Sequence, residues 1–81
     1  MPVMNPAELQ QHLAQAERHA AEVKRLIARQ EGLIANLAKG GHDTTDARKV
    51  METLRDTQAI HDADVRRLLE ALQAASQPVA Q

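Results

Sequence analysis

The chain has 81 residues, contains no cysteine, phenylalanine, tyrosine or tryptophan, and carries 10 Lys and Arg against 11 Asp and Glu, a net charge of −1. This length allows one small domain with an aliphatic core, and the lack of cysteine excludes disulfide staples and thiolate chemistry. The balanced charge argues against bulk electrostatic attraction to nucleic acid or acidic lipid.

The first predicted element is a long helix from about residue 6 to residue 39. Asn5 is a favourable N-cap, Pro6 suits the first helical position, and Glu8 stands where a capping box places its carboxylate. Apolar or small residues then recur at spacings of four and three, which defines a heptad seam interrupted only by Gln30. The predicted seam comprises Leu9, Leu13, Ala16, Ala20, Val23, Ile27, Gln30, Ile34 and Leu37.

The apolar stripe widens toward the end of this helix. Leu26 and Leu33 each lie one position before a seam isoleucine, Ile27 and Ile34. A two-stranded coiled coil does not need a stripe of this width, whereas a helix with more than one neighbour does. The widening therefore favours a four-helix bundle.

The helical pattern breaks at a turn made of Gly40, Gly41, His42, Asp43 and Thr44. Two consecutive glycines stop a helix, and the following Asp43 or Thr44 can cap the next one. We predict a turn over residues 40–43 and a second helix over about 44–76, followed by a frayed tail at 77–81.

The second helix repeats the heptad pattern of the first. Its predicted seam comprises Ala47, Met51, Leu54, Gln58, His61, Val65, Leu68, Leu72 and Ala75, flanked by Val50 and Leu69. Charges of opposite sign recur at i,i+3 or i,i+4 and predict ion pairs along a solvated face. The predicted pairs are Arg48 with Glu52, Glu52 with Arg55, Asp62 with Arg66, and Arg66 with Glu70.

A short turn makes the second helix return antiparallel beside the first, so partners should have residue numbers that add to about 84 or 85. In this register Gln30, Gln58 and His61 form a polar belt between the helices. Two helices alone bury too little apolar surface to offset the entropy of ordering the chain. We therefore predict an all-α, single-domain helical hairpin that dimerises into an antiparallel four-helix bundle.

A larger set of residues carries a resemblance to other proteins. The set comprises Ile27, Arg29, Leu33, Ile34, Leu37, the turn Gly41, His42, Asp43, Thr44, and then Ala47, Leu54, His61, Arg67, Leu68 and Leu69. Through them the chain resembles uncharacterised short proteobacterial helical-hairpin proteins with a Gly-His-Asp-Thr turn. The resemblance covers most of both helices, implies a helical hairpin, and brings no known activity with it.

The residues that could carry chemistry point mainly to structural roles. The polar belt could hold a ligand or sense pH through His61, but polar core residues more commonly fix register and oligomeric state. The single serine, Ser76, lies at a fraying end, and no histidine has a glutamate three residues before it. His12 and His19 are two turns apart, too far to share a metal ion within one hairpin, although symmetry mates could meet there. The sequence predicts no catalytic residue, cofactor or metal site.

The leading hypothesis is a non-catalytic dimerisation or protein-interaction module, with a homodimer favoured and a further protein partner left open. The first alternative is an RNA-binding bundle that uses the basic cluster Arg18, Lys24, Arg25 and Arg29, although stacking aromatic residues are missing. The second alternative is a metal- or ligand-binding bundle centred on His61. No apolar run approaches a membrane span and no basic leader precedes Pro6, so we expect a cytoplasmic protein.

Overall fold

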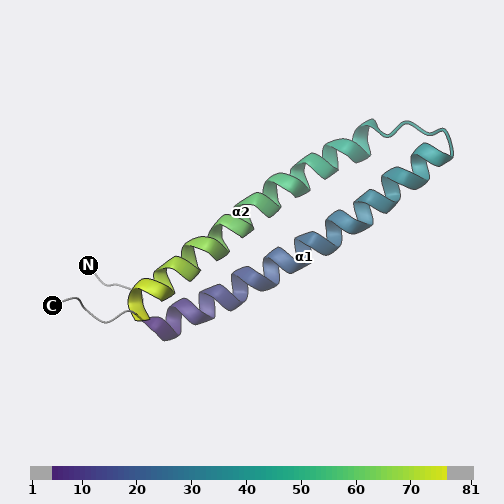
Figure 1. Cartoon of the computed structure of the whole chain (residues 1–81). Coiled ribbons are helices and arrows are strands. Elements are labelled where there is room, and N and C mark those ends of the chain that lie inside the picture. Colours follow the sequence, from purple (N-terminus) through teal and green to yellow (C-terminus); the bar gives the residue numbers. More distant parts are fainter. Residues whose placement is uncertain (1–4, 77–81) are drawn as a thin grey trace.

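A computed structural model describes residues 5–76 as two long helices joined by a short turn (Figure 1). Helix α1 spans Pro6–Lys39 and helix α2 spans Thr45–Ser76, and no strand occurs between residues 5 and 76. The helices run antiparallel, and the start of α1 lies beside the end of α2 (Figure 1). The predicted helical hairpin is confirmed, while the tail predicted at 77–81 lies outside the described residues.

Asn5 caps the start of α1. Its Oδ1 accepts the backbone N–H of Glu8 at 2.8 Å, and its carbonyl accepts the N–H of Leu9 at 3.0 Å. The Glu8 carboxylate accepts a hydrogen bond from the side-chain amide of Asn5 at 3.0 Å, whereas a capping box would direct it to the backbone N–H. The start of α1 is therefore determined by residues within one helical turn.

The two glycines have different roles at the end of α1. Gly41 has φ +75°, which a residue with a side chain rarely adopts, and the N–H of His42 donates to Leu37 O at 2.9 Å. The N–H of Gly41 donates to Ala38 O at 3.1 Å, and these two bonds form a Schellman motif. Gly40 has φ −83°, but a Cβ there would lie 2.8 Å from the His42 ring.

Asp43 and Thr44 share the cap of α2, which begins at Thr45. Thr44 O accepts the N–H of Arg48 at 2.9 Å, the first bond of the helix. Asp43 Oδ1 accepts the backbone N–H of Thr45 at 2.9 Å and its hydroxyl at 2.7 Å. Both residues named as possible caps therefore act together, one through its carbonyl and the other through its carboxylate.

We expect the contribution of Asp43 to stability to depend on pH. The hydrogen bonds from the Thr45 hydroxyl and then from its backbone N–H hold the pKa of Asp43 below its ordinary value of 3.8. A lowered pKa stabilises the fold above the unfolded-state pKa, and this stabilisation is lost as pH falls through the folded-state value. Melting curves should show Asp43→Ala less stable than wild type at pH 6, with the gap narrowing toward pH 2 to 3. A gap of constant size would contradict a role for the charge.

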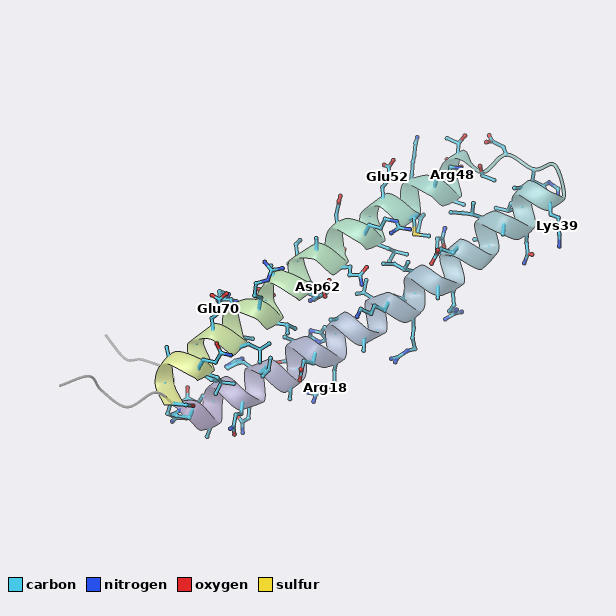
Figure 2. All side chains as sticks on the ribbon, viewed as in Figure 1. Arg18, Lys39, Arg48, Glu52, Asp62 and Glu70 are labelled. Carbon is cyan, nitrogen blue, oxygen red and sulfur yellow. The ribbon has the colours of Figure 1, made fainter. Side chains whose placement is uncertain are left out.

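The seams of α1 and α2 meet in two clusters, and side chains fill the space between the ribbons along the hairpin (Figure 2). The terminal cluster contains Leu9, Ala16 and Leu68, with Leu13, Val65, Ala71 and Leu72 packed against it. The turn-side cluster contains Val23, Ile27 and Met51, with Ile34 and Leu54 packed against it.

Both clusters are shallow. No side chain between residues 5 and 76 is completely buried, and Ala75, predicted in the seam, is exposed near the end of α2. The radius of gyration is 18.4 Å, whereas a compact domain of this length has about 12 Å. The hairpin therefore holds its helices together by one narrow contact and encloses no deep core.

Candidate interaction face

The seam has two flanks, which give the hairpin two different long faces. Residues seven apart share a line along a helix, and equivalent flanks of antiparallel helices lie side by side. We define the leucine–histidine face by two such lines: His12, His19, Leu26 and Leu33 of α1, and Val50, Thr57, Asp64 and Ala71 of α2. We define the charged face by the other two: Gln10, Glu17, Lys24, Glu31 and Ala38 of α1, and Arg48, Arg55, Asp62 and Leu69 of α2.

The turn half of the leucine–histidine face carries an apolar groove. Its lining includes Leu26, Leu33 and Val50, three large apolar side chains that are exposed, and Leu54, which is half-buried. Arg29 and Gln30 complete the groove. Exposed aliphatic residues that gather around one groove indicate an interaction surface more strongly than residues scattered singly.

The charged face has a different groove at the same level of the hairpin. Glu31, Arg48, Glu52 and Arg55 line it together with small and seam residues. Figure 2 shows Arg48 and Glu52 along α2 near the turn and Glu70 near its other end. Half of the residues that line this groove are charged, and none of the exposed large apolar side chains lies on it.

The solvated face predicted along α2 is confirmed, because all six charged residues of the predicted pairs are exposed, but the four ion pairs predicted from their spacing do not form. Among the described residues, the one ion pair within 4 Å joins Arg67 to Asp64 at 3.0 Å. Arg48 instead donates from Nε to the Thr44 hydroxyl at 2.9 Å. Exposed ion pairs gain little free energy over solvated charges, so their partners cannot be read from spacing alone.

The terminal half of the leucine–histidine face carries histidines in place of leucines. The rings of His19 and His61 lie 5.4 Å apart between centroids and are tilted by 56°. A groove beside them is lined in part by His12, Asp64 and Arg67. The predicted register placed His61 opposite Val23, and both residues do line one pocket, but His19 shares it.

His19 is the residue that sequence reasoning missed as a neighbour of His61. The available signal was its position beside the seam residue Ala20, on the flank that continues to Leu26 and Leu33. The small Ala20 leaves room for the two rings to approach across the helices.

The predicted polar belt is not a connected group. Gln30 donates from Nε2 to Ala47 O at 2.8 Å, toward the start of α2. The Thr57 hydroxyl, which lies next to Gln58, donates to Thr53 O within its own helix. No hydrogen bond links Gln30, Gln58 and His61 in the described part of the chain. The predicted register placed Gln30 opposite Leu54, but its flexible side chain instead reaches the backbone carbonyl of Ala47.

Replacing Gln30 with Leu is expected to leave stability unchanged or to raise it by up to about 1 kcal/mol, because a half-buried polar group becomes apolar. The carbonyl of Ala47, itself a helical residue, can still accept its helical bond after the amide is removed. Thermal unfolding of both proteins at one concentration checks this. A loss above about 1 kcal/mol would show that the Gln30 hydrogen bond fixes the register.

Three of the four basic residues proposed for RNA lie on one side of α1. Lys24 lies on the charged face and Arg29 lines the apolar groove on the opposite side. Arg18 and Arg25, seven residues apart, share the outer side of α1, where Arg18 is labelled in Figure 2. Arg29, eleven residues after Arg18, lies within about 40° of both arginines around the helix, and Lys24 points away from them.

Between residues 5 and 76, no group of three or more histidine and carboxylate side chains is placed to hold a metal ion. Neither described helix has an apolar stretch long enough to cross a membrane. Ser76 donates its hydroxyl to Leu72 O at 2.8 Å. Comparisons of the chain with known protein families, curated proteins and solved structures find no match.

Proposed function

We propose that this chain is a non-catalytic dimerisation module, in which two hairpins pack through their leucine–histidine faces into a four-helix bundle. The observation that carries this proposal is the asymmetry of the hairpin. Leu26, Leu33 and Val50 surround one exposed groove, while the groove on the opposite side has charges at half of its lining positions and none of the exposed large apolar side chains. A second copy of the same face offers matching apolar residues.

The exposed surface area of one hairpin supports a partner as large as a second hairpin. The chain exposes 6335 Å² of surface, whereas a compact monomer of its 8.9 kDa mass exposes about 4800 Å². The excess is about 1500 Å², and even half of it approaches the roughly 800 Å² that each partner contributes to a standard interface. Covering one long face with an interface of about 800 Å² would remove about half of this excess.

The distribution of residues along the face favours a dimer with both turns at the same end. In that arrangement the exposed leucines of the two copies meet at the turn half, and the histidines meet at the terminal half. With the turns at opposite ends, full overlap would place Leu26 and Leu33 of one copy against the imidazoles of the other. Apolar surface buried against apolar surface gives the larger stabilisation.

Sedimentation equilibrium over a range of concentrations tests the proposal. We expect a mass twice that of one chain and a melting temperature that rises with protein concentration, because dissociation accompanies unfolding. A strongly helical sample with the mass of one chain at every concentration would contradict the dimer.

A further inference from the structure

The His19–His61 pair has the spacing of two ligands that share one metal ion. Its ring centroids are 5.4 Å apart. Two imidazoles bound to a tetrahedral zinc ion through nitrogens at about 2.05 Å have centroids about 5.2 Å apart. The two rings come from different helices, so the backbone of the hairpin, and not one flexible segment, sets their separation.

A single hairpin supplies only half of such a site. No third ligand converges with the two rings in the described part of the chain. Glu22 lines the same pocket but is exposed, and Asp64 on the other side of the pair is bound to Arg67 at 3.0 Å. Structural zinc sites in proteins are nearly always four-coordinate, so two further ligands are required.

The leucine–histidine face indicates where these ligands come from. Its α1 line changes from Leu33 and Leu26 at the turn half to His19 and His12 at the terminal half. When two copies pack with their turns at the same end, the His19–His61 pairs of both copies face each other across the two-fold axis. Imidazoles covered without partners would cost free energy, and coordination of a metal ion satisfies them.

We propose that His19 and His61 of two copies together bind one divalent transition-metal ion of the zinc class at the terminal half of the dimer. This inference rests on the proposed dimer with both turns at the same end. Imidazole nitrogen suits zinc, copper, nickel and cobalt, whereas magnesium and calcium prefer oxygen ligands. The ion would hold the two hairpins together at the terminal half, where the leucine–histidine face carries no exposed leucine.

Zinc chloride, with magnesium chloride as the control, tests this on the full chain. We expect equilibrium dialysis to give one zinc ion per two chains. Sedimentation should show that zinc lowers the dissociation constant of the dimer at least tenfold, whereas magnesium leaves it unchanged. His19→Gln and His61→Gln should each abolish the zinc effect, measured for each variant as the ratio of its dimer dissociation constants without and with zinc. His42→Gln, which changes a histidine of the turn, should behave like wild type.

The possible results distinguish a failure of the proposed metal site from a failure of the proposed dimer. A dimer that ignores zinc, or whose response to zinc survives both His19→Gln and His61→Gln, overturns the metal site and leaves the dimerisation module standing. A chain that is monomeric without metal and dimeric with zinc contradicts the apolar dimer and supports the shared site. One zinc ion per chain on a monomer overturns both.

Discussion

Replacing Leu33 with Gln is expected to raise the dissociation constant of the dimer by between roughly thirtyfold and a thousandfold. Leu33 is 46% exposed in the hairpin and lies on the apolar groove beside Leu26 and Val50. Burying the remaining surface of one leucine stabilises the dimer by about 1 to 2 kcal/mol, and the two-fold symmetry doubles this effect. A dilution series in sedimentation velocity measures the change.

Leu69→Gln is the matched control for this variant. Leu69 is 42% exposed, nearly the same as Leu33, but it lies on the charged face. Leucine and glutamine have similar helix propensities, so both variants should keep their helical content. We expect Leu69→Gln to change the dissociation constant by less than about threefold, within the range of a surface substitution. A larger loss in Leu69→Gln than in Leu33→Gln would show that the hairpins associate through the other face.

The helix boundaries could be predicted because local chemistry determines them. Asn5 caps a helix that starts at Pro6, and Gly41 adopts a left-handed conformation within two residues of the helix end. The signals for both lie inside one helical turn of sequence, so no tertiary contact is needed to interpret them. The antiparallel hairpin then follows from the short turn.

The side-chain partners could not be predicted in the same way. Gln30 bonds to Ala47, and His61 meets His19 one turn away from the expected Val23. The Gln30 amide binds a backbone carbonyl seven residues from Leu54, its partner in a register that sums to 84. A seam of side chains carries no signal for a backbone acceptor, so it leaves several partners open. The free-energy differences among exposed arrangements are small, which is also why the predicted ion pairs of α2 do not form.

The candidate interaction face could be predicted from the sequence only in part. The widened stripe at Leu26 and Leu33 is visible in the sequence, and it points to a second neighbour. Val50 and Leu69 look alike as flanks of the second seam, yet they lie on opposite faces. Only the pairing of the two helices shows that Val50 joins the leucines around one groove while Leu69 lies apart from them.

Replacing Ile27 with Ala is expected to lower the free energy of unfolding by about 2 to 4 kcal/mol. Ile27 is 7% exposed and packs with Val23 and Met51 in the turn-side cluster. The hairpin has only two such clusters and no deep core, so neighbouring side chains cannot compensate for the lost contacts. For a domain of this size the melting temperature should fall by roughly 10 to 30 °C, as measured by circular dichroism at fixed protein concentration.

Ile60→Ala removes the same atoms from a side chain that is 62% exposed, and it is the matched control. The loss of the little surface that Ile60 buries is offset by the better helix propensity of alanine, so we expect a change within about 0.5 kcal/mol. Ile60 lies just outside the Val50–Thr57 line of the leucine–histidine face. If Ile60→Ala destabilised the protein as much as Ile27→Ala, Ile60 would have to be covered in the assembly. The interface would then extend past that line onto the outer side of α2, and the two hairpins would cross at an angle instead of packing face to face.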